Sequence, residues 1–258
     1  MSLSTEQLAD WERDGFCLLR GFGSRDVVDA MLARVIECVR AKASGADIAP
    51  AYLVAESATM ASAKTPEQAV SKLFRIHREE AVFREFCSND RVLDIVESLL
   101  GSELDCFLSQ FIFKHPGALG QPWHQDAFYF PFDRGPQVGL WLAVTEATLD
   151  NGPLWVVPGS HRDPVHDVVP DQREHANISY VEIVSRDTSE ARPVLMQPGD
   201  LLVFHSHLMH KSTDNQSDAM RAAMVYHYGE TGTVDQSRER FGFIPPNIDW
   251  MSVRGKAT

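Results

Sequence analysis

The chain has 258 residues, of which 44% are hydrophobic and 23% charged, and its formal net charge is −12. This is the composition of an ordinary globular protein, with enough residues for one large domain or two small ones and a substantial core. The excess of acidic residues argues against nucleic acid or an anionic membrane as the main partner, because both are bound by a basic surface.

The N-terminal residues predict two helices with a short strand between them. Ser4 and Gln7 have the spacing of a capping box at the start of a helix over residues 5–15, which a glycine ends. Residues 15–23 predict a short strand, and Ser24 is placed to cap a second helix. Apolar residues recur in that helix at helical spacing: Val28, Met31, Leu32, Val35, Ile36 and Val39.

The following part of the chain predicts a loop and then a third helix. Residues 43–66 are rich in Ala, Ser and Pro, which is typical of a loop or a mobile excursion. Residues 88–101 predict a helix that ends at a glycine. Its apolar face consists of Val92, Ile95, Val96 and Leu99.

From Leu104 onward the sequence predicts many short strands. Apolar or alternating runs are separated by turn signals such as Asp150-Asn151-Gly152, Pro158-Gly159 and Pro198-Gly199. Such spacing is typical of an antiparallel β-sandwich or barrel. The runs cover residues 105–114, 138–148, 152–160, 178–184, 192–197, 199–204 and 221–229. No repeat, low-complexity segment or clear linker divides the chain, so we expect a single domain over residues 1–258.

Neither a disulfide framework nor a targeting segment is expected. The cysteines lie far apart in the sequence and form no CxxC pair: Cys17, Cys38, Cys87 and Cys106. The N-terminal residues lack the pattern of a secretory signal, and no apolar run approaches the ~20 residues that span a bilayer. We therefore expect a cytoplasmic protein.

The segment His124-Gln125-Asp126 is a candidate for metal binding. On a strand, residues two apart face the same side, so both side chains can reach one metal ion. H-x-D alone is a weak signal, and His161-Arg162-Asp163 repeats it. A polar surface pair is the commoner outcome for such a motif. A third ligand strengthens the hypothesis, because two histidines and one carboxylate on one face of iron are typical of non-haem Fe(II) oxygenases.

Three histidines within residues 200–212 compete to be that third ligand. His210 and Ser212 share a face of an alternating strand, and an antiparallel return strand would bring Arg221 beside them. If the strand stays regular, His205 and His207 have the opposite parity. Parity therefore favours His210, although it leaves the other two open.

The combination of motifs resembles the phytanoyl-CoA dioxygenase family of Fe(II)/2-oxoglutarate oxygenases. Several segments carry the resemblance in the right order: WHQD at 123–126, NGPLWVVPGSH at 151–161, the run from 199 to 221, the opening 8–22 and the closing 249–255. The late motif of the family, G-D-x-L-x-F-x₅-H-x-S followed by an arginine, falls on this sequence with its histidine at His210.

The resemblance implies a fold and a site. The fold would be mainly β with N-terminal helices, a cupin-like jelly roll or double-stranded β-helix. Its parts would be a mostly helical front over 1–103, a jelly-roll core over 104–230 and a tail over 231–258. The metal ligands would be His124, Asp126 and His210. The second H-x-D would lie in a loop at the barrel mouth, where His161 or Arg162 could at most touch the substrate.

The resemblance also implies contacts to the co-substrate. The distal carboxylate of 2-oxoglutarate would meet Arg221 and Ser212, and an arginine fork suits a carboxylate. Lys72, Gln110 and Trp141 would be further contacts, although a solvated lysine, a strand glutamine and a core tryptophan remain ordinary alternatives. An intact Asp126 favours hydroxylation, because related halogenases have a small residue at that position. The aromatic run over 128–132 either lines the substrate pocket or packs beneath a lid.

The expected activity is therefore that of a dioxygenase. Fe(II) would be the cofactor, with 2-oxoglutarate and O₂ as co-substrates. The enzyme would hydroxylate an aliphatic carbon of a small organic molecule and release succinate and CO₂. Two alternatives stay open: a Zn-dependent cupin-like hydrolase and a non-catalytic jelly-roll binding protein. Arg221 argues against the hydrolase, because hydrolysis needs no anchor for a dicarboxylate, and the complete set of three ligands plus Arg221 argues against the binding protein. The identity of the substrate and the oligomeric state do not follow from the sequence.

Overall fold

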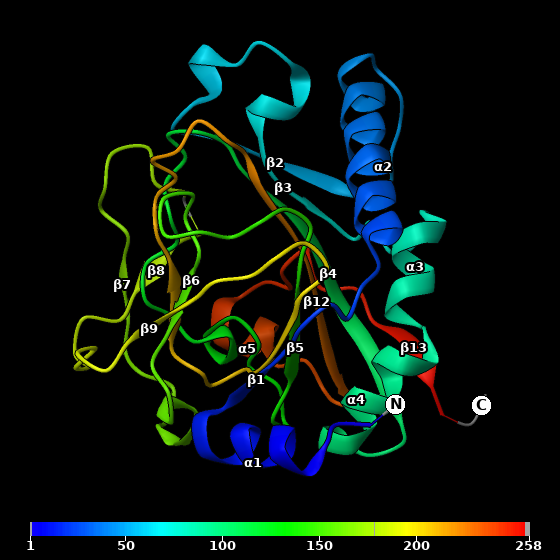
Figure 1. Cartoon of the computed structure of the whole chain (residues 1–258), viewed down its shortest axis with the longest axis vertical. Coiled ribbons are helices and arrows are strands. Elements are labelled where there is room, and N and C mark those ends of the chain that lie inside the picture. Colours follow the sequence, from blue (N-terminus) through cyan, green and yellow to red (C-terminus); the bar gives the residue numbers. More distant parts are fainter. Residues whose placement is uncertain (1, 178, 256–258) are drawn as a thin grey trace.

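A large antiparallel sheet forms the centre of the fold in the computed structural model, which describes residues 2–177 and 179–255 (Figure 1). Its strands follow the order β1-β10-β5-β12-β4-β3-β2, and β13 also pairs with β4. In that order the bounds are Phe16–Leu19, Leu201–His205, Val138–Ala143, Arg221–Glu230, Leu104–Lys114, Val70–Phe74 and Tyr52–Ala55, with β13 at Met251–Arg254.

A smaller sheet completes the β core. Its order is β11-β6-β9, with bounds His210–Ser212, Leu154–Val156 and Arg192–Val194. The short strands β7 (Val169–Pro170) and β8 (Val181–Glu182) pair with each other. Residues of both the large and the small sheet line one cavity, which therefore lies between them. Two antiparallel sheets enclosing a cavity form the jelly roll that the sequence predicts.

Three helices, α2, α3 and α4, pack against the other face of the large sheet, and Figure 1 shows them grouped on one side. The helices are α1 Thr5–Asp14, α2 Arg25–Ala43, α3 Ala81–Cys87, α4 Asp90–Leu100 and α5 Ser237–Phe241. The main core contains buried residues of α2, α3 and α4 together with residues of β4, β5, β10 and β12. Among the described residues, no helix combines the length and the apolar character needed to cross a membrane.

The predicted helix ends are confirmed. Ser4 and Gln7 form both hydrogen bonds of the capping box, and Gly15 ends α1 with a φ of 82°. The Ser24 hydroxyl accepts a hydrogen bond from the Val27 amide at the start of α2. An N-cap side chain supplies an acceptor to a backbone N–H that the helix leaves without a partner. Local polar chemistry therefore defines where these helices begin.

The front part of the chain is less helical than expected. Besides the predicted strand β1, the unpredicted strands β2 and β3 join the large sheet, and α3 is a helix that the sequence analysis did not predict. The segment 43–66, expected to be a loop, contains β2 and a single turn of 3₁₀-helix at Met60–Ser62. Strand β2 pairs with β3, and Tyr52 and Val54 line the cavity. The expectation was wrong because strands of four or five residues carry too little periodicity to be recognised.

Strand β12 divides its side chains between the two faces of the large sheet. Its even-numbered residues from Ala222 to Tyr228 belong to the core beneath the helices. The odd-numbered residues Arg221, Val225 and His227 line the cavity. Successive residues of a strand point to opposite faces, so one strand supplies both a core face and a cavity face.

The run over residues 200–212 is not one regular strand. Strand β10 ends at His205, a turn follows, and β11 begins at His210 in the other sheet. Parity cannot be counted across such a break, so the argument that separated His210 from His205 and His207 was wrong. The expected pairing partner of Arg221 was also wrong, because β12 pairs with β4 and β5 and not with β11.

Candidate metal centre and its cavity

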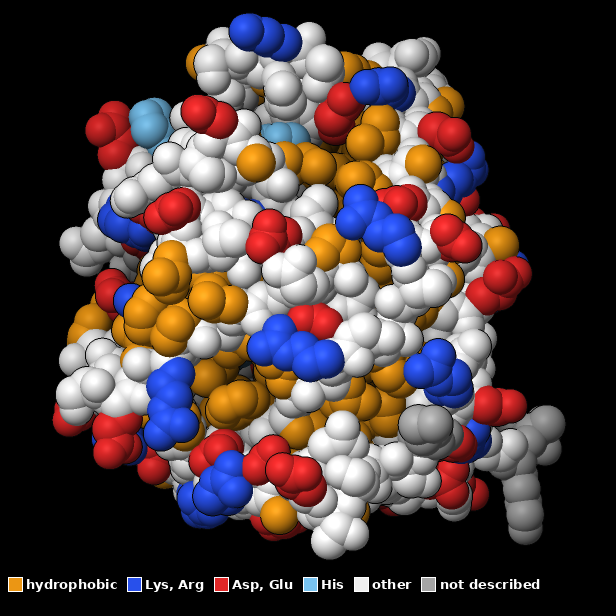
Figure 2. All heavy atoms as spheres, viewed as in Figure 1, with side chains coloured by type: hydrophobic (Ala, Val, Ile, Leu, Met, Phe, Trp, Pro, Cys, Tyr) orange, Lys and Arg blue, Asp and Glu red, His pale blue; other side chains and the backbone are white. Residues whose placement is uncertain are grey.

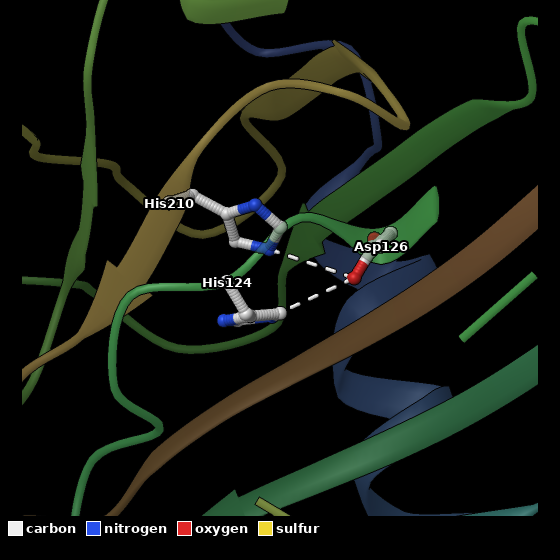
Figure 3. A group of neighbouring side chains, drawn as sticks. All are labelled: His124, Asp126 and His210. Carbon is white, nitrogen blue, oxygen red and sulfur yellow. Dashed lines mark ion pairs between the residues drawn. The ribbon is translucent and has the colours of Figure 1, made fainter. Parts of the chain in front are cut away.

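Three buried side chains meet at one end of the cavity (Figure 3). His124 and His210 each turn Nε2 toward Oδ1 of Asp126, at 3.5 Å and 3.8 Å. One potential ligand atom from each residue lies within 4.8 Å of the others. Two imidazoles and one carboxylate in this arrangement are the donor set typical of a non-haem iron site.

Backbone pairing brings these residues together. The His124 and His210 backbones exchange two hydrogen bonds of 2.9 Å, which extends the small sheet by one bridge. Gln125 has extended backbone angles, φ −117° and ψ 133°, and Asp126 begins a 3₁₀ turn, Asp126–Phe128. The side chains on either side of Gln125 therefore project to the same side, as the H-x-D spacing predicts.

Hydrogen bonds orient both histidines for metal binding. Nδ1 of His124 lies 2.8 Å from the carbonyl of Pro122, and Nδ1 of His210 lies 2.9 Å from that of Leu208. A carbonyl only accepts, so each Nδ1 carries the hydrogen and each Nε2 presents a lone pair toward Asp126. This tautomer is the one required for binding a metal through Nε2, and the three residues fit a divalent cation.

Electrostatics support the same protonation states. Burial, with His124 nearby, lowers the pKa of His210 to about 4, so its imidazole is neutral at neutral pH. Burial opposes ionisation of Asp126, but the neighbouring imidazoles outweigh burial and hold its pKa well below the usual range. Neutral imidazoles and an ionised carboxylate are the forms that bind a metal.

The two other histidines of the late motif lie elsewhere. His205 packs against Trp11 of α1, with ring centroids 5.7 Å apart, and its Nδ1 accepts a hydrogen bond from the His207 amide. Neither His205 nor His207 lines the cavity. The structure thus brings His210 alone of the three to His124 and Asp126.

The second H-x-D holds α1 against the core. Arg162 donates hydrogen bonds to the carbonyls of Glu12 and Arg13, at 2.6 Å and 3.0 Å. His161 packs beside Gly15, where an added Cβ would come within 2.5 Å of the imidazole. Neither His161 nor Arg162 lines the cavity beside the metal centre.

The cavity next to the metal centre has a volume of about 550 Å³ and is lined by three basic side chains, and by the acidic Glu56 besides Asp126. Lys72, Lys114 and Arg221 are 8%, 4% and 1% exposed. Among the described residues, no carboxylate lies within ion-pair distance, 4.0 Å, of any of the three. Burying a charge without a partner is costly, so this arrangement indicates a site for an anion.

Arg221 and Lys114 are neighbours in the β12–β4 pairing. Two guanidinium nitrogens of Arg221 donate to the Gly152 carbonyl, at 2.9 Å and 3.2 Å, and the third, Nη1, has no partner among the described residues. Burial lowers the pKa of Arg221 to about 10, which leaves it charged at neutral pH. Burial and then Arg221 hold the pKa of Lys114 well below its usual value.

Lys114 is a cavity residue that the sequence analysis missed. Its Nζ donates to the Ser212 hydroxyl at 2.8 Å and to the Thr213 carbonyl at 2.6 Å. A signal was present, because Lys114 lies four residues after Gln110 on the same strand and therefore on the same face. The lysine was overlooked because it is the last residue of an apolar run, where a solvated side chain is common.

The other residues named from the sequence also line the cavity. The Ser212 hydroxyl accepts a hydrogen bond of 3.0 Å from the backbone N–H of Gln121, in addition to the hydrogen bond from Lys114. Lys72 lies over the Tyr180 ring at 4.7 Å from Nζ to the centroid, and Arg221 lies 5.4 Å from the Trp141 ring centroid. Gln110 faces the same space from β4.

Aromatic side chains form a second wall of the cavity. Phe128, Tyr129 and Phe130 line it, whereas Phe132 packs away from it against Phe107 and Trp250. The C-terminal segment adds Phe241 and Phe243. The expected aromatic run is therefore split between the cavity and the core.

On the face drawn in Figure 2, basic side chains are scattered among acidic ones rather than gathered into a patch.

Comparison with known proteins reveals extensive similarity. The family model described as phytanoyl-CoA dioxygenase (PhyH) matches residues 11–223. Phytanoyl-CoA dioxygenase 1 of Oryza sativa subsp. japonica is 28% identical over 277 residues, which cover 95% of this chain and 96% of that protein. Phytanoyl-CoA dioxygenase domain-containing protein 1 of Mus musculus is 30% identical over 276 residues, covering 90% of this chain and 92% of its own length.

Solved structures share the fold at lower identity. The apo form of the non-heme monooxygenase ThoJ superposes with a TM-score of 0.72 at 21% identity, over 96% of this chain and 84% of that one. EctD from S. alaskensis, solved with 2-oxoglutarate and 5-hydroxyectoine, gives a TM-score of 0.67 at 23% identity, over 88% and 76%. The double-stranded β-helix predicted from the sequence is thereby confirmed.

Proposed function

This chain belongs to the phytanoyl-CoA dioxygenase family, and on that premise we propose that it is a non-haem Fe(II)/2-oxoglutarate-dependent dioxygenase. His124, Asp126 and His210 would hold Fe(II). The enzyme would hydroxylate an aliphatic carbon of a small organic substrate and release succinate and CO₂. We treat residues 1–258 as a single domain that carries this one site.

The observation that carries the proposal is the buried, unpaired Arg221 with the basic Lys114 next to it, beside the metal centre. Arg221 and Lys114 are buried, adjacent and without a carboxylate partner among the described residues. A dicarboxylate that chelates the metal at one end would neutralise them with its other end. 2-Oxoglutarate has this shape and charge, and its presence in the EctD structure supports the proposal.

Each residue at that end of the cavity has a role toward the distal carboxylate. The Nη1 of Arg221 is a buried donor without a partner among the described residues, and the Gly152 carbonyl fixes the plane of the guanidinium. Lys114 and the Ser212 hydroxyl, already hydrogen-bonded to each other, would offer further donors. Charge-assisted hydrogen bonds of this kind are stronger than neutral ones. Lys72, Gln110 and Trp141 are proposed as additional contacts from the cavity walls.

Fe(II) bound at the three ligands would activate O₂, a reaction that the side chains themselves cannot perform. In the proposed stoichiometry, 2-oxoglutarate, O₂ and a substrate C–H yield succinate, CO₂ and a C–OH, with one oxygen atom entering succinate and the other entering the product. The chain's own contribution is orientation and the exclusion of water. The aromatic wall formed by Phe128, Phe130 and Phe241 would hold the substrate against the metal centre.

The two alternatives from the sequence are less well supported. A zinc hydrolase has no need for a dicarboxylate anchor beside the metal ligands, and a non-catalytic binding protein has no need for the complete set of three ligands together with Arg221. Asp126 is present, ionised and in place, which supports hydroxylation over halide transfer.

Succinate formation tests the proposed function. Purified protein with Fe(II), 2-oxoglutarate and O₂ should form succinate slowly and faster when a true substrate is added, and a chelator should stop the reaction. Succinate and CO₂ should appear in equal amounts, as measured with labelled 2-oxoglutarate. Protein that forms no succinate with any metal, or forms it unchanged after metal removal, would refute the proposal.

A further inference from the structure

Asp126 has two carboxylate oxygens, and the structure gives them different partners. Oδ1 faces Nε2 of His124 and of His210. Oδ2 instead lies 2.7 Å from Nε2 of His227, a residue of β12 that is 2% exposed. One oxygen therefore points toward the candidate metal position, and the other is held by a fourth side chain that the sequence analysis did not single out.

The direction of this hydrogen bond follows from the chemistry of the groups. An ionised carboxylate only accepts, so Nε2 of His227 carries the hydrogen and donates it. Nδ1 of His227 is buried and has no partner among the described residues. The contact with Asp126 is thus the one polar contact of the imidazole within the described part of the chain. A nitrogen already donating to a carboxylate has no lone pair to offer a metal.

Packing keeps His227 in this orientation. Its ring lies against Phe107, Phe130 and Phe204, with centroid distances of 5.9 Å, 5.0 Å and 5.8 Å. The Phe204 ring also contacts His210, at 5.2 Å, and so lies next to both histidines. Gly139 makes room for it, because an added Cβ at that position would come within 2.2 Å of the Phe204 ring. A rigid apolar setting therefore fixes the imidazole beside Asp126.

We propose that His227 is a positioning residue that makes Asp126 a one-oxygen ligand, by holding Oδ2 away from the metal position. The inference rests on the proposed function and deepens it. A 2-oxoglutarate oxygenase needs open positions for a chelating co-substrate and for O₂, and the two-histidine, one-carboxylate arrangement provides them. A carboxylate free to bind through both oxygens would occupy one of those positions. His227 would prevent this while contributing no ligand itself.

Two substitutions at His227 separate hydrogen bonding from packing. His227→Leu fills much of the same space without a donor, whereas the amide of His227→Gln can reach as far as Nε2. Loss of a residue that orients a ligand typically weakens metal binding about 10- to 100-fold. We expect a loss in this range for His227→Leu in equilibrium Co(II) binding, and recovery of most of the affinity in His227→Gln.

The visible spectrum of the Co(II)-loaded protein gives a second readout, because its band intensities follow the coordination of the metal. His227→Leu should alter the spectrum at saturating Co(II), and His227→Gln should retain the wild-type spectrum. His77→Leu is the matched control. His77 is also buried, has one hydrogen bond of 2.7 Å, to the Ser109 hydroxyl, and has one nitrogen without a partner, yet it does not line the cavity. His77→Leu should leave Co(II) binding and its spectrum unchanged.

The outcomes separate this inference from the proposed function. Wild-type protein that binds neither Co(II) nor Fe(II) would overturn both. Wild-type affinity and an unchanged spectrum in His227→Leu would overturn only the role of His227. If His227→Leu does not fold, nitrogen NMR of the Zn(II)-loaded wild-type protein can instead show whether Nε2 of His227 carries a hydrogen. A hydrogen on Nε2 of His227 supports the inference, and an Nε2 without one contradicts it.

Discussion

His210→Ala should abolish stable Fe(II) binding and with it turnover of 2-oxoglutarate. His210 supplies one of three potential ligand atoms that lie within 4.8 Å of one another. Its Nε2 carries a lone pair that points toward the candidate metal position. Loss of a residue that merely orients a ligand weakens metal binding about 10- to 100-fold, so loss of a ligand should exceed that range. Equilibrium dialysis against Fe(II) under anaerobic conditions, together with succinate formation, measures both effects.

His207→Ala is the matched control for this prediction. His207 lies three residues earlier in the same motif but does not line the cavity, so iron binding and succinate formation should both remain close to wild type. His205→Ala should also bind iron, but with some loss of stability, because the substitution removes the contact with Trp11 of α1. If His207→Ala loses the iron and His210→Ala retains it, the assignment of the third ligand is wrong.

Arg221→Ala should weaken 2-oxoglutarate binding by about thirty-fold or more. Removing one partner of a buried charge-assisted pair costs about 2–5 kcal/mol, because the remaining charge is left buried and unpaired, and each 1.4 kcal/mol is about tenfold in affinity. Iron affinity should change little, since Arg221 is not among the ligands. Arg221→Lys should recover only part of the loss, because an ammonium lacks the two-pronged fork of a guanidinium.

Calorimetry with Ni(II)-loaded protein, in which no turnover occurs, gives the 2-oxoglutarate affinity of each variant. Lys114→Met tests the neighbouring cation and should also weaken binding. Arg162→Ala is the control, because that arginine also donates to backbone carbonyls but lies outside the cavity. Wild-type affinity in Arg221→Ala would mean that another cation anchors the co-substrate, and Lys114 and Lys72 would be the candidates.

Features fixed by short-range chemistry were predictable from the sequence. Interactions within a few residues determine the capping box at Ser4, the end of α1 at Gly15 and the many short strands after Leu104. The H-x-D pair at His124 was predictable for the same reason, because two-residue periodicity needs only an extended backbone between them. The turns at Gly152, Gly159 and Gly199 adopt the positive φ that their glycines permit.

Features that depend on which strands pair were not predictable by local patterns. The position of His227 beside Asp126 comes from the packing of β12 against the metal motif, and the sequence around His227 looks like an ordinary strand. His210 was chosen with a parity argument that the structure invalidates, since the chain changes sheets between His205 and His210. The family motif, with its fixed spacing to Ser212 and Arg221, carried that assignment.

The most direct test of the central claim is an anaerobic titration of 2-oxoglutarate into the Fe(II)-loaded wild-type protein. Chelation of the iron by the co-substrate produces a metal-to-ligand charge-transfer absorption in the visible range. We predict that this band appears and saturates at one 2-oxoglutarate per protein, and that it is absent when His210 is replaced by alanine. A protein that binds both Fe(II) and 2-oxoglutarate but never develops the band would contradict the claim that they meet at His124, Asp126 and His210.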